Sequence, residues 1–144
     1  MITGDEFISL AGKLASRPDA DEATNRTAVS RAYYGAFHLA KALLDEMGFP
    51  APSNPGGHAF VYRRLFFSAH PNAQAIGALL SDLHPTGIEA DYDLNSKEAG
   101  TNRNAKQCVE ESHRVRSAIL ACRQERAFSQ IKADIAAYEK KIGG

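Results

Sequence analysis

Arg31 and His38 are the residues in this 144-residue chain whose types and spacing best suit chemistry. On a helix that advances about 100° per residue, their side chains lie within about 20° of each other, two turns apart. Imidazole titrates near neutral pH and can take a proton from a ribose 2′-hydroxyl group or give one to a leaving oxygen. A guanidinium stays charged and fits phosphate oxygens. The pair can therefore carry out phosphoryl transfer on RNA. RNA supplies its own nucleophile, so no metal is obligatory.

Gly35 lies between this pair on the same predicted helical face. Glycine inside a helix costs about 1 kcal/mol relative to alanine, so its presence fits the close approach of a ligand, a phosphate or a partner helix to the backbone, and equally fits drift at a tolerant surface position. Spacing alone does not establish chemistry, because Arg64 and His70 form a second arginine–histidine pair in the same chain. Arg31 and His38 therefore also fit a solvated or interface pair without a catalytic role.

Further polar and aromatic side chains are candidates for a supporting role. Tyr34 and Tyr92 could stack on a nucleobase, although such tyrosines more often pack between helices with the hydroxyl group bonded. Asp91 and Asp93 could form a paired-carboxylate or metal site, although acids in such a turn more often cap a helix or pair with arginine. If the fold brings the elements together, Asp91 could instead orient the histidine or pair with the arginine described above.

The sequence lacks the spacing that metal and cofactor sites require. The five histidines include no His-x3-His pair, and Cys108 and Cys122 do not form a Cys-x2-Cys pair. No Walker or dinucleotide-binding motif occurs. We therefore predict neither a metal nor a cofactor. We expect both cysteines to lie in the apolar core as free thiols.

The composition excludes several classes of protein. Seventeen Lys and Arg residues balance seventeen Asp and Glu residues, so nucleic acid binding by bulk positive charge is excluded. No apolar run reaches the roughly 20 residues of a membrane helix, and the first residues lack the basic region of a secretory signal. Together with two free thiols, these features predict a cytoplasmic protein that has no membrane partner.

Apolar residues recur with helical periodicity through nearly the whole chain. We predict helices over residues 5–16, 21–47, 58–69 and 71–83, and a long C-terminal helix over residues 103–141. Pro85 and Gly87 are expected to kink or interrupt the fourth helix. The elements predict an all-α bundle of four or five helices. It forms a single domain over residues 1–144, with a core of about residues 5–122 and a helical extension over residues 123–144.

Two apolar stripes are expected to make different contacts. The first lies opposite the arginine–histidine pair and is predicted to face the core: Val29, Tyr33, Ala36, Phe37, Ala40, Leu44 and Met47. The second lies in the extension: Phe128, Ile131, Ile135, Tyr138 and Ile142. The helical register shifts at residues 123–126, which fits either a bend in one long helix or a segment that docks elsewhere. A bundle of the first 122 residues does not need the second stripe, so we expect it to serve a partner protein.

The motif that surrounds the arginine–histidine pair resembles the signature of a known family. The segment Ser30-Arg31-Ala32-Tyr33-Tyr34-Gly35-Ala36-Phe37-His38-Leu39-Ala40, followed by Ala42-Leu43-Leu44, is similar to the HEPN domain, and most of all to its small stand-alone bacterial and archaeal members. His58 matches a histidine that opens the next helix in that group, and Ala90-Asp91-Tyr92-Asp93 matches a later motif. Order and spacing agree over about residues 21–121.

The resemblance implies an all-α up-and-down bundle that usually forms a homodimer. Many HEPN proteins are metal-independent endoribonucleases, either toxins paired with a small nucleotidyltransferase-like antitoxin or effectors in phage defence. In these enzymes an arginine–histidine motif from each of two copies forms one composite cleft. The expected function is RNA cleavage, with His38 as general acid–base and Arg31 as the clamp on the transition state. The expected supporting or ligand-binding residues are Tyr34, Gly35, His58, Asp91 and Tyr92.

A non-catalytic HEPN module is the alternative that the same residues leave open. Ala32 follows the arginine where nuclease members often have a polar residue, and Gly87 lies in a stretch where stand-alone members often have an arginine. Such a module would bind a nucleotide or a nucleotidyltransferase-type partner, with the stripe at residues 128–142 as a docking surface. The sequence alone leaves open whether the protein is an enzyme.

Overall fold

A computed structural model describes residues 2–143 of the chain, and all regular structure among them is helical. The elements are α1 (Gly4–Ala15), α2 (Glu22–Glu46), α3 (Gly57–Phe66), α4 (Pro71–Tyr92), the short 3₁₀ helix η1 (Glu98–Gly100), α5 (Asn102–Cys122) and α6 (Glu125–Gly143). The prediction of an all-α fold is confirmed.

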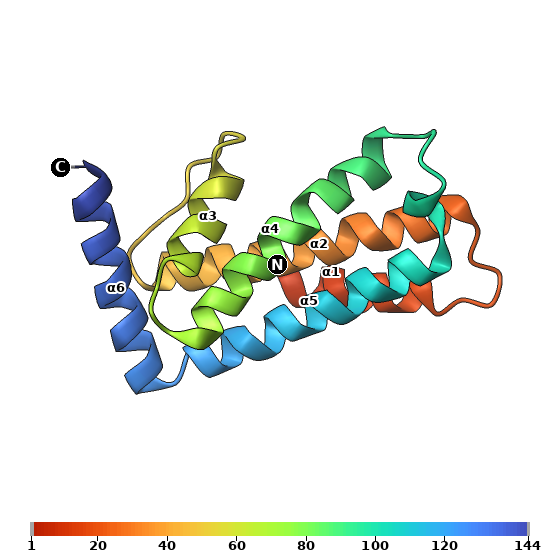
Figure 1. The fold of residues 1–144 in the computed structure, drawn as a ribbon. Coiled ribbons are helices and arrows are strands. Elements are labelled where there is room, and N and C mark those ends of the chain that lie inside the picture. Colours follow the sequence, from red (N-terminus) through yellow and green to blue (C-terminus); the bar gives the residue numbers. More distant parts are fainter. Residues whose placement is uncertain (1, 144) are drawn as a thin grey trace.

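Four helices form a bundle in which the chain direction alternates from α1 to α2, α4 and α5 (Figure 1). α2 is central, because it packs against α1, α4 and α5, and also contacts α3. The short α3 lies along α4, and α6 turns away from the end of α5 and crosses one end of the bundle (Figure 1). Among residues 2–143, no helix has both the length and the apolar character of a membrane span.

α2 begins and ends close to the predicted positions. The Asp21 carboxylate accepts a 2.8 Å hydrogen bond from the backbone N–H of Thr24, which satisfies one of the N–H groups left unpaired at the start of the helix. After the helix, Gly48 adopts a φ of +94°, a left-handed conformation that glycine reaches without a Cβ clash. All members of the predicted core stripe of this helix are buried.

The side of α2 opposite that stripe is also covered, by α1. A Cβ atom on Gly35 would lie 2.6 Å from Cγ1 of Ile8 and 2.8 Å from the carbonyl oxygen of Gly4. In return, a Cβ on Gly4 would collide with the carbonyl oxygen of Gly35. The close approach suggested by the glycine is therefore that of another helix of the same chain. The expectation that Gly35 itself contacts a ligand is wrong, because α1 fills that space.

α4 continues through Pro85 and Gly87, where the sequence predicted a kink or an end. Proline removes one backbone hydrogen bond and costs about 3 kcal/mol within a helix. Packing against α2, α3 and α5 supports α4 along its length and offsets this cost. Gly87 has a specific role in that packing, since its Cβ position lies 3.4 Å from the side chain of Tyr33. Tertiary packing here outweighs the local preference of two residues.

The predicted long C-terminal helix is two helices, because α5 ends at Cys122 and α6 starts at Glu125. α6 packs on α3, and the Ser68 hydroxyl group donates a 2.8 Å hydrogen bond to the Asp134 carboxylate. Ile131 and Ile135 of the second stripe are fully buried. The expectation that a partner uses this stripe is therefore wrong for its central residues, which complete the chain's own core.

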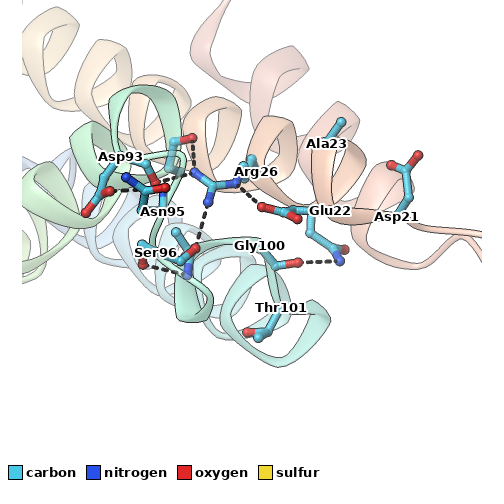
Figure 2. Close-up of polar contacts among 12 residues, drawn as sticks. Asp21, Glu22, Ala23, Arg26, Asp93, Asn95, Ser96, Gly100 and Thr101 are labelled. Atoms are coloured by element: carbon cyan, nitrogen blue, oxygen red, sulfur yellow. Dashed lines mark hydrogen bonds and ion pairs between the residues drawn. The ribbon is translucent and has the colours of Figure 1, made fainter.

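Arg26 on α2 contacts the C-terminal end of α4, and Figure 2 shows these contacts. Its side chain is 7% exposed and reaches the C-terminal end of α4, where carbonyl groups lack partners within the helix. The guanidinium donates hydrogen bonds to the carbonyl oxygens of Ala90 at 3.0 Å, Asp93 at 2.9 Å and Ser96 at 2.7 Å. Glu22, one turn away on α2, accepts a further bond of 3.0 Å. The end of α4, which carries Asp91, is thereby tied to α2.

Candidate active site

The guanidinium of Arg31 lies between two aromatic rings. Its central carbon is 4.9 Å from the ring centroid of Phe7 on α1 and 5.5 Å from that of Tyr34 on α2. Both distances are within the range of cation–π attraction. Its Nη2 atom also donates a 3.3 Å hydrogen bond to Oγ of Ser30. These contacts hold the arginine side chain in place at the edge of α2, where it is only partly buried.

Asp91 approaches this arginine through a third residue. The Ser30 hydroxyl group donates a 3.1 Å hydrogen bond to Oδ2 of Asp91, and the same hydroxyl oxygen accepts the bond from Arg31. The carboxylate forms no direct ion pair with Arg31 within residues 2–143, and no hydrogen bond with His38. Asp91 therefore contributes to the site by orienting Ser30, a more indirect role than the sequence suggested.

His38 also lies near Phe7. The two ring centroids are 6.0 Å apart in an edge arrangement, and the His38 side chain is exposed. Its pKa is lowered first by the partial burial of the ring among its neighbours, and further by the positive charges of Lys41 and Arg31. The imidazole is thus favoured in its neutral form, which can accept a proton. Phe7 is thus a common neighbour of Arg31 and His38.

A groove of about 570 Å³ begins at His38 and runs between the start of α1 and the second half of α2. Lys41 lines it one turn further along α2, and the Glu46–Arg123 ion pair, with an N···O distance of 2.9 Å, lines it as well. Its volume is within the range of small-molecule sites. The groove gives a ligand access to the imidazole of His38 from the solvent.

Two further histidines stack beside Arg31 and His38. His58, in the first turn of α3, lies between the rings of Phe37 and His84, with centroid distances of 4.4 Å to each. The Tyr33 hydroxyl group is 2.5 Å from Nδ1 of His58. The pKa of His58 is lowered by burial and then by the charges of His84 and His38, and burial alone lowers the pKa of His84.

The structure brings together most, though not all, of the residues that the sequence singled out. Arg31, Tyr34, His38 and His58 form one region, with the Tyr34 and His58 ring centroids 6.1 Å apart. Tyr92 is 80% exposed at the end of α4 and makes no ring contact or hydrogen bond with them among the described residues. Among the described residues, no contact therefore connects Tyr92 with the candidate site.

Sequence reasoning missed Phe7, Lys41 and His84. Phe7 belongs to the apolar face of α1, and nothing in its residue type marks a contact with a cation on another helix. Lys41 lies three positions after His38, which is a helical spacing that does point to a shared face. His84 is separated from its stacking partner on α3 by 26 positions and by a loop, so only the fold reveals it.

Within residues 2–143, no group of three or more His, Cys, Asp or Glu side chains is placed to hold a metal ion. No protein-family model, curated protein or solved structure matches the chain. The chemistry of the site therefore has to be argued from its own residues. Those residues offer a held guanidinium, a solvent-accessible neutral imidazole and a stack of aromatic rings.

Proposed function

We propose that the protein is a metal-independent endoribonuclease of the HEPN type, and that Arg31 and His38 carry out the reaction. The observation that carries this proposal is that both side chains lie close to Phe7: the guanidinium carbon of Arg31 is 4.9 Å from its ring centroid, and the imidazole centroid of His38 is 6.0 Å from it. The guanidinium is held by two rings and a hydroxyl group, and the imidazole is open to solvent. In the proposed site both groups act on one substrate.

Each group has one task in the reaction. Neutral His38 takes the proton of a ribose 2′-hydroxyl group, and the 2′-oxygen then attacks the adjacent phosphorus. The bond between phosphorus and the 5′-oxygen breaks, and that oxygen receives a proton from the imidazolium of a second copy. Arg31 stabilises the negative charge that builds up on the phosphate oxygens. The products are a 2′,3′-cyclic phosphate and a 5′-hydroxyl end.

A homodimer supplies the second imidazole in this scheme. Net charge zero does not argue against such a site, because two arginines and two histidines at one interface suffice to bind a single phosphate. The aromatic rings that hold each guanidinium reduce the conformational freedom lost when the substrate binds. A nucleotidyltransferase-type antitoxin that covers this face would block access to both groups at once.

The test is cleavage of a single-stranded RNA in EDTA by wild-type protein, the R31A and H38A variants, and the matched controls R114A and H113Q on α5. We expect each site variant to lose about 100-fold or more in kcat and the controls to stay within about threefold of wild type. Product ends identified by mass spectrometry should be cyclic phosphate and 5′-hydroxyl. Wild-type protein that leaves RNA intact, or H38A protein that cleaves normally, would contradict the proposal.

A non-catalytic nucleotide-binding module is a second candidate, favoured by the groove of about 570 Å³ that starts at His38. Lys41 would contact the phosphates of a nucleotide there, and the apolar part of the lining, Phe7 and Leu39, would contact the base. Isothermal titration calorimetry with nucleoside mono-, di- and triphosphates tests this directly. This candidate is supported if wild-type protein binds a nucleotide without cleaving RNA and the K41A variant no longer binds it. No heat of binding for any nucleotide would exclude it.

A further inference from the structure

Tyr33 and His58 share a hydrogen bond that bears on which nitrogen of His58 carries the proton. Tyr33 is a core residue of α2, and burial raises the pKa of its hydroxyl group, so the group keeps its proton and, being buried, needs an acceptor for it. Within residues 2–143 this hydroxyl group has one hydrogen-bond partner, Nδ1 of His58, at 2.5 Å. A neutral His58 that accepts at Nδ1 carries its own proton on Nε2.

The surroundings of His58 favour this neutral form. Its ring is stacked between Phe37 and His84, and the planes of the two imidazoles differ by only 10°. A proton on either imidazole would place a positive charge 4.4 Å from the centre of the other ring. The residue also lies in the first turn of α3, where the helix dipole disfavours a cation. The groups that face it are Tyr33, Tyr34 and His38 from α2 and His84 from α4.

A neutral donor at this position complements the arginine. Tyr34 links the two groups, since its ring centroid is 6.1 Å from that of His58 and 5.5 Å from the guanidinium carbon of Arg31. A second cation beside Arg31 would be repelled and would lose hydration. A neutral N–H group adds a directed hydrogen bond without that penalty.

We propose that His58 is a further substrate-binding residue of the site, whose Nε2–H group donates a hydrogen bond to a phosphate oxygen of the RNA. Tyr33 is the positioning residue that fixes this tautomer. The inference rests on the proposed ribonuclease function and extends it, because it assigns a phosphate contact to α3 in addition to those on α2. His84 is the ring that supports His58 from the side of α4.

Two substitutions at one position separate the proposed donor from a merely structural imidazole. The amide of H58Q reaches about as far as Nε2 and retains an outward N–H group, whereas the shorter amide of H58N reaches only about as far as Nδ1. We expect H58N to lower kcat for RNA cleavage about 100-fold, and H58Q to stay within about tenfold of wild type. Circular dichroism should give the same melting temperature for both variants. Equal activity losses in both would overturn the proposal.

Nitrogen-15 NMR of histidine-labelled protein measures the tautomer directly. We expect the Nε2–H form of His58 in wild-type protein at neutral pH, and a mixture of tautomers in Y33F, which keeps the ring but lacks the hydroxyl group. An Nδ1–H form in wild-type protein would overturn the assignment. If wild-type protein cleaves RNA and H58N cleaves it equally well, only this inference is overturned. If wild-type protein does not cleave RNA, both the proposed function and the phosphate contact are overturned.

Discussion

The guanidinium of Arg26 on α2 donates a 2.9 Å hydrogen bond to the carbonyl oxygen of Asp93, which lies 67 positions later in the chain (Figure 2). This bond and its neighbours close the C-terminal end of α4 with a side chain from another helix. The arrangement fixes the backbone around Asp91, whose carboxylate accepts a hydrogen bond from Ser30 next to Arg31. Stability of the bundle and the geometry of the candidate site therefore depend on the same contact.

Replacing Arg26 with alanine is expected to lower the free energy of unfolding by about 3 kcal/mol, because several buried carbonyl groups lose their donor together. Urea unfolding followed by circular dichroism measures this change. R17A is the matched control, because the Arg17–Asp19 ion pair is exposed and such pairs contribute about 1 kcal/mol or less. Equal losses of unfolding free energy in the two variants would show that the hydrogen bonds of Arg26 stabilise the fold no more than an exposed ion pair does.

Local signals in the sequence predict the central helix better than they predict its long-range contacts. The N-cap Asp21, the glycine at 48 and the apolar periodicity between them gave α2 its bounds. Apart from Glu22 one turn away, the partners of Arg26 gave no such signal, because they are backbone carbonyls 63 to 70 positions later, and any residue type carries those. The same holds for the candidate site, where Arg31 and His38 follow from one helix and Phe7 follows only from the packing of α1.

A methyl group at Gly35 should destabilise the fold, although alanine is the better helix former. Its Cβ would meet Ile8 and the backbone of Gly4, so G35A is expected to lose about 2 kcal/mol of unfolding free energy. Gly12 on α1 is the control, since its Cβ position has only a Val109 methyl group nearby, at 3.8 Å. G12A is expected to gain about 0.5–1 kcal/mol from helix propensity. Chemical denaturation of both variants tests the sign, and a stabilised G35A would contradict the close packing.

The burial of Ile131 predicts that α6 unfolds together with the bundle. I131A should leave a cavity and cost about 2–5 kcal/mol of unfolding free energy. I142A, on the same helix but 57% exposed, should change stability by less than about 0.5 kcal/mol. A single cooperative transition is expected for both, measured by urea unfolding with two spectroscopic probes. If I131A behaves like I142A, α6 does not belong to the cooperative core.

The stacked histidines predict that the fold loses stability in mild acid. The pKa values of His58 and His84 are lowered in the folded state, so the folded chain binds fewer protons than the unfolded chain. Their contribution is complete above the unfolded histidine pKa of about 6.5, and it is lost as the pH falls through that value toward the lower folded pKa. Urea midpoints between about pH 7.5 and pH 5 measure the slope.

His84→Phe provides the matched variant for this pH dependence, because it keeps an aromatic ring in the stack and removes one titrating group. The slope of stability against pH should become shallower in H84F. Stability above about pH 7.5 should change by less than about 1.5 kcal/mol if the ring is accommodated. A slope as steep as that of wild-type protein would assign the acid sensitivity to other groups, such as His38 or His113, whose pKa values burial also lowers.

Phe7 is predicted to affect RNA cleavage through the guanidinium of Arg31 without touching the reacting atoms itself. Leucine at this position retains apolar bulk but lacks the ring face that lies 4.9 Å from the guanidinium carbon. Loss of a partly exposed cation–π contact of about 1 kcal/mol corresponds to a fall of about fivefold in kcat for F7L. The exposed Phe66 on α3 supplies the control F66L, which should cleave RNA at the wild-type rate. If F7L also matches the wild-type rate in single-turnover assays, the ring does not hold Arg31 in its active position. In that case Tyr34 and Ser30 alone orient the guanidinium.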